Sequence, residues 1–213
     1  MESFLPPTDL HDLDAYNFGT REPPAKAPGA GAAPKERTAA AKAARRSALF
    51  ASDGLRQSVN AVVLVHSQRH PHALLLRSTA EGAPRWKLPG GRLRPGESGA
   101  EGLARSLGRQ LGAGVQPEAL ELIAEWWCPA EEAAREYPYL PVHVTRPRGS
   151  RKLYLVSVAP GVLATVRGAW ELVAVPLQDL YGNERFGPVL AALPAQLARC
   201  NFNSLALPEE APS

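Results

Sequence analysis

The sequence predicts an α/β fold: a three-layer α/β/α sandwich with a mixed sheet, preceded by an N-terminal arm and a helix. Apolar, β-branched runs alternate with helical segments from about residue 58 onward, which is typical of this architecture. The 213 residues suffice for one sizeable core, and no internal repeat is visible. We expect an arm, linker and basic helix over residues 1–57, a globular domain over 58–205 and a tail over 206–213.

The N-terminal part is extended and then helical. Residues 1–20 form an arm whose apolar anchors are Leu5, Leu10, Tyr16 and Phe18. A Pro/Gly/Ala-rich linker over 23–34 follows, and then a segment of high helix propensity from about 36 to 51, which Gly54 stops.

Charge is distributed unevenly along the chain. The segment 21–56 holds eight Lys/Arg against three acidic residues, a net +5, whereas the whole chain is +3. A second basic cluster contains Arg146, Arg148, Arg151 and Lys152. Both clusters fit contact with a polyanion such as RNA, and both fit a solvated helix face and a basic loop.

The core is expected to begin with a hairpin, because "SVNAVVLVHS" and "HALLLRS" flank the turn "QRHP". His66, His70 and His72 lie around this turn. They lack acid or cysteine partners, so we interpret them as surface imidazoles rather than metal ligands.

The remaining elements follow in order. We expect a short strand and loop at "RWKLPGG", a helix over 99–111, and strands at "ALELIAEWWCPA", "KLYLVSVA" and "WELVAVPL". Trp126 and Trp127 should point to opposite faces of their strand. The proline-rich run 136–151 cannot be a central strand. A helical turn at 178–181 and a helix over 188–201 close the domain; the apolar side chains of the latter (Val189, Leu190, Leu193 and Leu197) suit a dimer surface or the core equally.

Two classes of protein are disfavoured. The longest apolar run, Ala61–Val65, is too short to span a membrane, and the acidic N-terminus is not typical of a secretory signal. Cys128 and Cys200 have no companions at metal spacing, so we expect reduced thiols in an intracellular protein.

The segment 87–112 carries the most informative motif. Gly91, Glu97, Arg105 and Gly112 have the spacing of a pyrophosphate-hydrolysing loop and helix, and they resemble the Nudix box. That box continues after its arginine as Glu-apolar-x-Glu-Glu-x-Gly. Here the three glutamate positions hold Ser106, Arg109 and Gln110.

The missing carboxylates remove the metal chemistry. Positions i, i+3 and i+4 share one helix face, where three glutamates would bind Mg²⁺ and activate water. Ser106 and Gln110 are weak ligands, Arg109 is a fixed cation, and Glu97 and Glu101 are too few to replace the cluster. We therefore predict no catalytic residue, no metal site and no cofactor, with the box kept as scaffold through its glycine turn and its inward-facing Leu103, Leu107 and Leu111.

Further segments resemble one branch of the Nudix superfamily. The runs "DAYNFGTREP", "WKLPGGRLRPGE", "EYPYLPVHVTRPRGSRKLYLV" and "GPVLAALPAQLARCNF" are similar to the small, Nudix-fold subunit of pre-mRNA cleavage factor I, the family of cleavage and polyadenylation specificity factor subunit 5. The resemblance extends from about residue 8 to 203. It implies a Nudix-type sandwich in a nuclear, non-catalytic homodimer that binds a UGUA element of single-stranded RNA and recruits a larger subunit through that subunit's RNA-recognition domain.

The resemblance also implies where RNA would bind. The family's stacking phenylalanine aligns with Arg85 and its aromatic neighbour with Trp86. A base-reading arginine aligns with Lys42, and a base-reading glutamate with Pro34; Glu36 lies two residues later and can serve in its place. The glutamate that opens the first core strand is Asn60, and a tyrosine–glycine pair becomes Phe186 and Gly187. The expected RNA-binding residues are Glu36, Lys42, Asn60, Arg85, Trp86, Leu88, Phe186 and Gly187.

These substitutions bear on selectivity more than on fold. A lost stacking ring removes about 1–3 kcal/mol per base, although a guanidinium plane can stack in its place. Lysine at position 42 keeps the charge and loses the bidentate fork. Structural roles compete, since Trp86 and Phe186 suit the core and Lys42 suits a solvated helix. Two other functions stay open: a Nudix hydrolase of diphosphate-linked nucleosides and a protein-interaction scaffold without RNA reading.

Overall fold

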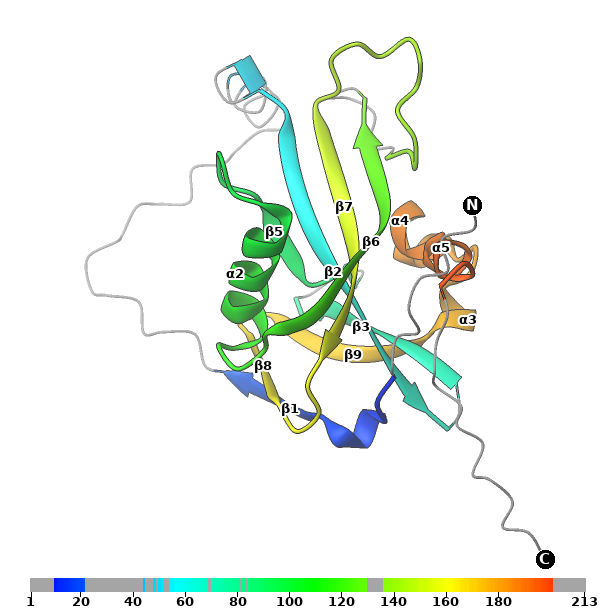
Figure 1. Cartoon of the computed structure of the whole chain (residues 1–213). Coiled ribbons are helices and arrows are strands. Elements are labelled where there is room, and N and C mark those ends of the chain that lie inside the picture. The colour runs from blue at the N-terminus through cyan, green and yellow to red at the C-terminus, as the bar shows by residue number, and fades with distance from the viewer. Residues whose placement is uncertain are drawn as a thin grey trace, which may run out of the picture.

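A mixed β-sheet lies between two layers of helices in this computed structural model (Figure 1). The structure describes residues 10–21, 44, 48, 50–51, 54–68, 70–80, 82, 84–129 and 136–200. One side of the sheet is covered by α2 (Gly99–Leu111), and the other by α3 (Leu177–Leu180), α4 (Pro188–Ala191) and α5 (Leu193–Leu197). The predicted three-layer α/β/α arrangement is confirmed.

The long strand β2 (Arg56–Ser67) organises the sheet, because its two halves have different partners. Its first part pairs in parallel with β7 (Gly149–Val158), and its end forms the expected antiparallel hairpin with β3 (His70–Ser78). The order along the sheet is β4-β3-β2-β7-β6, with β5 on β2 and β9 on β3; the added strands are β4 (Trp86–Lys87), β5 (Gly90–Arg92), β6 (Pro117–Cys128) and β9 (Trp170–Pro176).

Alternation along the strands builds two core layers. In β2, Val62 and Leu64 face α3–α5, whereas Val63 and Val65 face α2. This follows from the two-residue period of a strand, since both faces of the sheet must be apolar when both are covered. The box-helix leucines fill the α2 side as predicted: Leu103, Leu107 and Leu111 are all buried.

The N-terminal arm adds a second, two-stranded sheet. After a 3-10 turn, η1 (Leu13–Ala15), strand β1 (Asn17–Arg21) pairs in parallel with β8 (Leu163–Arg167), a strand that the sequence patterns did not predict. The Tyr16 hydroxyl donates to the Val158 carbonyl oxygen at 2.9 Å, and burial raises the pKa of this phenol, with a smaller contribution from Glu118. Tyr16 therefore anchors the arm on the α2 side of the core, whereas Leu10 is buried in the cluster on the α3–α5 side.

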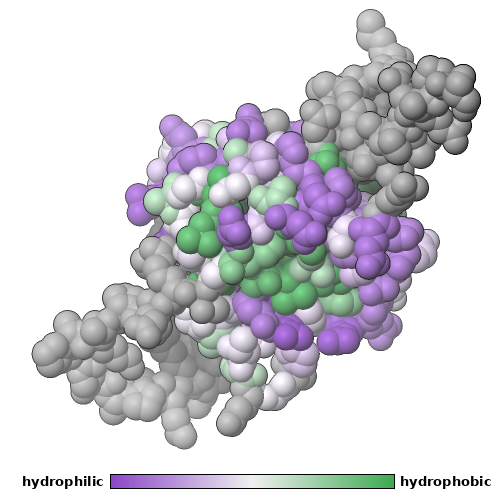
Figure 2. All heavy atoms as spheres, turned by 90° about the horizontal axis from the view of Figure 1, so that it is seen from below, coloured by the Kyte–Doolittle hydropathy of each residue, from purple (hydrophilic) through white to green (hydrophobic). Residues whose placement is uncertain are grey.

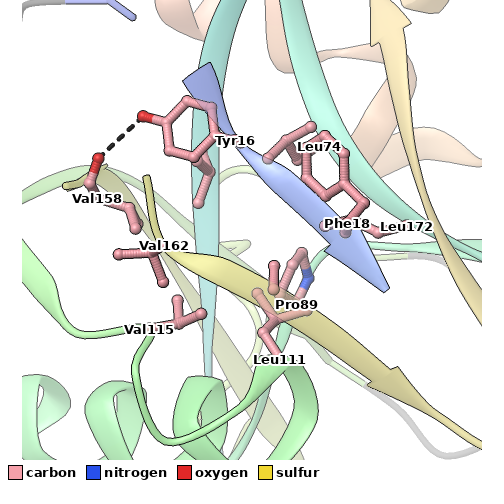
Figure 3. Close-up of a pocket in the computed structure, with 11 residues that line it drawn as sticks. Tyr16, Phe18, Leu74, Pro89, Leu111, Val115, Val158, Val162 and Leu172 are labelled. Atoms are coloured by element: carbon pink, nitrogen blue, oxygen red, sulfur yellow. Dashed lines mark hydrogen bonds between the residues drawn. The ribbon is translucent and has the colours of Figure 1, made fainter. Parts of the chain in front are cut away.

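The end of the molecule that carries β1 and β8 is partly apolar. Hydrophobic atoms gather near the centre of this face and hydrophilic ones border them (Figure 2). Phe18 and Leu163 are 42% and 55% exposed. A small pocket beneath the two strands has an almost wholly apolar lining in which Phe18 lies beside Leu74 and Leu172 (Figure 3). The pocket can therefore pack against apolar groups, and its lining has few atoms that could hydrogen-bond to a ligand.

The C-terminal prediction was wrong in its extent. In place of one helix over 188–201, α4 and α5 are separate short helices, and Pro194 occupies the first turn of the second. Proline suits a helix start and cannot continue the hydrogen bonding of a preceding helix. The four apolar residues that suited either a dimer or the core are all buried in the core: Val189, Leu190, Leu193 and Leu197.

The basic helix predicted over 36–51 lies mostly outside the described residues. The four that are described (44, 48, 50 and 51) are helical. The Arg148 guanidinium lies over the Phe50 ring at 4.6 Å, so this segment contacts the loop before β7. Within the described ranges, every helix is too short or too polar to cross a membrane.

Candidate nucleic-acid interface

The surviving glutamate of the box, Glu97, holds the loop and the helix together. Its carboxylate accepts two hydrogen bonds from the Arg105 guanidinium, at 2.6 and 2.7 Å, and one from the Arg94 backbone N–H at 2.8 Å. Arg105 also donates to the Arg92 carbonyl oxygen at 3.0 Å. The hydrogen bond from Arg105, followed by that from Arg94, lowers the pKa of Glu97 to about 2. This carboxylate therefore has a structural role: it links the loop at Arg94 to the helix at Arg105.

The second acid, Glu101, caps the helix that it belongs to. Its side chain accepts from the Ser98 backbone N–H, and the Glu101 N–H donates to the Ser98 hydroxyl oxygen, so the two residues form a capping box at the start of α2. The hydrogen bonds from Ser98 lower the pKa of Glu101. Both acids that the sequence left at the box therefore have structural partners.

Side chains at the three substituted positions make different contacts. Ser106 is fully buried, and a Cβ placed on Gly91 would come within 2.7 Å of its hydroxyl oxygen. The Gln110 amide accepts from the Gly90 N–H at 2.9 Å and donates to the Gly90 carbonyl oxygen at 2.6 Å. Arg109 is exposed. A buried hydroxyl, a committed amide and a cation occupy the place of the metal-binding carboxylates.

A lysine adds to the positive charge on this side. Lys87 lies over the Trp170 ring at 3.8 Å. Burial, and to a smaller degree the charge of Arg109, lowers the pKa of Lys87. Among the described residues, no group of three or more His, Cys, Asp and Glu side chains could hold a metal ion.

The opposite side of the same strand carries an aromatic pair. Trp86 points away from Lys87, because neighbouring residues of a strand face opposite sides. Its ring packs on Phe186 with centroids 5.0 Å apart and planes tilted by 59°. Phe186 ends η2 (Glu184–Phe186), which the Asn183 side chain caps, and Gly187 follows with a φ of 81° that favours glycine. Both rings are half-buried against the α3–α5 core.

Two guanidinium groups flank the indole of this pair. The Arg77 and Arg185 side chains lie 5.8 and 5.6 Å from the Trp86 ring. Arg77 is paired with Glu171, whereas Arg185 also lies 5.8 Å from the Phe186 ring. Sequence reasoning did not identify either arginine. Arg185 directly precedes Phe186 in the sequence, so it could have been recognised as a neighbour of a predicted RNA-binding residue.

Asn60 fixes the loop that leads from Trp86 to the box. Its amide nitrogen donates to the carbonyl oxygens of Leu88 (3.2 Å) and Pro89 (3.4 Å), and the Ala61 N–H donates to Pro89 at 2.8 Å. Leu88 itself is buried, so its side chain serves the core. Gly90 has φ 146°, and a Cβ there would lie 2.2 Å from the Val59 carbonyl oxygen.

The structure brings part of the predicted RNA-binding set together. Trp86 and Phe186 are in contact, Gly187 follows the second ring, and Asn60 holds the Leu88 backbone. Arg85 is exposed, and no described acid forms an ion pair with it. Glu36 and Lys42 lie outside the described residues.

A loop on the same chain exposes large apolar side chains. Tyr139, Leu140 and Val142 are 60%, 40% and 102% exposed, and the Tyr137 and Tyr139 rings lie 5.9 Å apart. Tyr137 is held by two backbone hydrogen bonds to Trp127 of β6. The prediction that residues 136–151 are not a central strand holds for 136–148 and is wrong for 149–151, which begin the central strand β7 after the last proline. Tyr137 is fixed on β6, and the residues that follow it expose apolar side chains.

Comparison with known proteins identifies the family. The NUDIX_2 family model, described as nucleotide hydrolase, matches residues 7–200. Pre-mRNA cleavage factor Im 25 kDa subunit 2 of Arabidopsis thaliana is 39% identical over 203 residues, 92% of this chain and 96% of that protein. Cleavage and polyadenylation specificity factor subunit 5 of Dictyostelium discoideum is 34% identical over 195 residues, 88% and 90% of the two chains.

Solved structures of Nudix proteins are similar at a lower level. A NUDIX hydrolase from Nitrosomonas europaea is 15% identical with a TM-score of 0.47, covering 70% of this chain and 92% of that one. The family model and the two sequence relatives together establish that this chain belongs to the Nudix family, in the branch of the cleavage factor Im 25 kDa subunits.

Proposed function

We propose that this protein is a non-catalytic, RNA-binding subunit of the nuclear pre-mRNA 3′-end cleavage and polyadenylation machinery. The observation that carries the proposal is the Trp86–Phe186 ring pair, flanked by the Arg77 and Arg185 guanidinium groups. Aromatic and guanidinium planes are the surfaces on which unpaired RNA bases stack. The names of the sequence relatives support the assignment to this process.

The box geometry supports binding without hydrolysis. A Nudix reaction needs carboxylates that hold Mg²⁺ on the box helix. Gln110 instead binds the Gly90 backbone, Ser106 is sealed in the core, and Arg109 places a permanent charge beside Lys87. The anionic groups of a nucleotide would meet cations directly here, and both described acids of the box, Glu97 and Glu101, are held in structural hydrogen bonds.

Trp86, rather than Arg85, is the base platform in this proposal. The indole is held by Phe186 and is only half-buried, so a base can stack on a ring whose orientation is already fixed. Arg85 is exposed, and the described residues provide no ion pair to hold its guanidinium in one plane. Asn60 and Gly187 hold the two chain segments that carry this platform: the Asn60 amide nitrogen donates to the Leu88 carbonyl oxygen, and the Gly187 N–H donates to the Glu184 carbonyl oxygen.

The exposed tyrosine loop is a candidate surface for the larger subunit. Aromatic side chains are enriched at protein–protein interfaces, and Tyr139, Leu140 and Val142 place three exposed apolar side chains close together in one loop. We propose that this loop contacts the larger cleavage factor subunit through its RNA-recognition domain, and that the protein works as a homodimer in the complex.

Titration with RNA tests the proposed function. Labelled UGUA and scrambled single-stranded RNAs are titrated at two salt concentrations with wild type, Trp86→Ala and Arg85→Ala. We expect tighter binding of UGUA, a loss of about tenfold or more for Trp86→Ala, and a small, sequence-independent loss for Arg85→Ala. Equal binding of both RNAs, or the larger loss with Arg85→Ala, would contradict the placement of the platform.

An activity assay tests the alternative that the protein is a Nudix hydrolase. Incubation with Mg²⁺ or Mn²⁺ and diadenosine polyphosphates should give no turnover above that of a Glu97→Gln, Glu101→Gln double variant. Turnover that this variant abolishes would assign catalysis to the box. An absence of binding to every RNA, with capture of the larger subunit intact, would leave the protein-interaction scaffold as the function.

A further inference from the structure

A second group of hydrogen-bond donors lies on the same face of the sheet as Asn60. Trp126 of β6 and Arg151 of β7 are directly opposite each other in the strand register, and Arg151 is in turn opposite Ser58 of β2. Opposed residues of neighbouring strands point to the same face, with Cβ atoms about 5 Å apart. Asn60 follows Ser58 by two residues and therefore shares that face.

The guanidinium of Arg151 is held in place on one side only. Its Nη2 donates to the Glu136 carboxylate at 2.8 Å, and 34% of the Arg151 side chain remains exposed. Its Nε is buried and has no hydrogen-bond partner among the described residues. Glu136 fixes the orientation of the group and leaves part of its donor fork unused.

Two indole N–H groups on the same face of the sheet are also unpaired among the described residues. The Nε1 atoms of Trp126 and Trp86 are buried without a hydrogen-bond partner in the described part of the chain, and Trp126 as a whole is only 4% exposed. Both side chains contact the same apolar cluster, which also contains Leu88 and Leu153. Buried donors are rarely left unpaired, and three on one sheet face indicate a place where acceptor groups are received.

The expected ligand is uncharged and rich in acceptors. Because Glu136 already neutralises Arg151, the pair has little net attraction for a phosphate group. Indole and guanidinium N–H groups can only donate, so they select carbonyl oxygens and ring nitrogens. Guanine offers O6 and N7 to such a fork, and uracil offers its two carbonyl oxygens. The base edge is therefore a better match than the RNA backbone.

We infer that Arg151, oriented by Glu136 and backed by the Trp126 indole, forms a second base-reading subsite for the carbonyl edge of guanine or uracil. Arg151 lies on β7, which β2 and β3 separate from β4 and Trp86, so that one base stacks on Trp86 while another nucleotide of the same RNA is read at Arg151. This inference rests on the proposed RNA binding. It adds a source of sequence selectivity that the substituted family positions do not supply.

The test uses the full chain and RNAs that lack one carbonyl at a time. Wild type, Arg151→Ala and Arg146→Ala are titrated by fluorescence anisotropy with UGUA RNA, with the same RNA containing 2-aminopurine for guanine, and with RNAs in which each uracil is replaced by cytosine. Arg146 is an exposed arginine of the adjoining basic loop, so its removal changes the net charge equally. Thermal melts of each variant check folding.

One RNA should be insensitive to the loss of Arg151. We expect Arg151→Ala to weaken binding of UGUA by about tenfold or more and to have little effect on the RNA that lacks the carbonyl read by Arg151. Whether that RNA carries the guanine or a uracil replacement identifies the base. Arg146→Ala should weaken every RNA by the same small factor. Trp126→Phe, which keeps a ring and removes the N–H, should reproduce part of the Arg151→Ala pattern.

Three results would overturn the subsite. The first is an Arg151→Ala loss that is equal on all RNAs, since this means phosphate contact. The second is no difference between Arg151→Ala and Arg146→Ala. The third is that Trp126→Phe and Arg151→Lys both bind every RNA with the affinity of wild type. Wild-type binding that depends on Trp86 would leave the proposed function standing in each case, whereas wild type that binds no RNA would remove both.

Discussion

The side chain of Gln110 forms a two-way hydrogen bond with the backbone of Gly90: Oε1 accepts from the Gly90 N–H at 2.9 Å, and Nε2 donates to the Gly90 carbonyl oxygen at 2.6 Å. Twenty residues separate the two along the chain. A glutamate at this position could accept from the N–H, but its carboxylate would face the carbonyl oxygen. The amide thus ties the box helix to the glycine loop at a position where a hydrolase would bind its metal.

Gln110→Glu should therefore destabilise the protein. Replacing the donating amide by a carboxylate leaves the Gly90 carbonyl oxygen unpaired and close to a negative charge, at a cost of about 1–3 kcal/mol in the free energy of unfolding. A protonated carboxyl can donate again, so the folded state raises the pKa of the new group. The free energy of unfolding of Gln110→Glu, measured with urea, should be slightly below that of wild type near pH 4. The difference should grow as the pH rises.

Gln116→Glu provides the matched control for that change. Gln116 donates to the Ala113 carbonyl oxygen at 3.2 Å from an exposed position, where water can replace the lost donor. We expect a loss within about 0.5 kcal/mol and a weak pH dependence. Equal destabilisation by the two substitutions would show that the Gln110–Gly90 contact stabilises the fold no more than an exposed glutamine contact does.

Gly90→Ala should be among the most damaging glycine substitutions. The new methyl would meet the Val59 carbonyl oxygen at 2.2 Å, and the φ of 146° is rarely adopted by other residues. We expect a cost of about 3 kcal/mol in unfolding free energy. Gly96→Ala, at a φ of 76° with open space around it, should cost only about 1 kcal/mol. Similar melting temperatures for the two variants would contradict the crowding at Gly90.

Acid should weaken the contact between Glu97 and Arg105. The folded-state pKa of Glu97, about 2, lies below the usual value of 4.5, so the carboxylate stabilises the fold above pH 4.5 and loses this contribution as the pH falls toward 2. Glu97→Gln should be less stable than wild type at pH 7, and the difference should shrink across that window. Glu118→Gln, at an exposed acid, serves as control in chemical unfolding at several pH values.

Restoring the three glutamates should not restore a hydrolase. Ser106 is fully buried, so Ser106→Glu would place a charge in the core at a cost of about 3 kcal/mol or more. Arg109→Glu, at an exposed position, should be tolerated and should remove the smaller of the two causes that lower the pKa of Lys87, the larger being burial. Unfolding curves and Mg²⁺-dependent phosphate release measure both effects. A stable, active triple variant would show that the scaffold still accommodates the metal.

Local pattern in the sequence determined the central elements. The alternation of β2, the leucine spacing of α2 and its glycine-rich entry were all readable, because burial on both faces of a sheet and on one face of a helix imposes fixed periods. The loss of the carboxylates was equally plain. These features depend on neighbours in the chain, so an isolated sequence specifies them.

Contacts between distant segments were decided only by the tertiary structure. Trp86 and Phe186 are one hundred residues apart, and no local pattern indicates that their rings meet. The five residues of β8 are too few to carry a clear period, and their strand exists because β1 supplies the hydrogen-bond partners. The sequence pattern predicts which face of an element a side chain lies on, whereas three-dimensional packing determines which group it contacts. In this protein the Gln110 side chain contacts the Gly90 backbone.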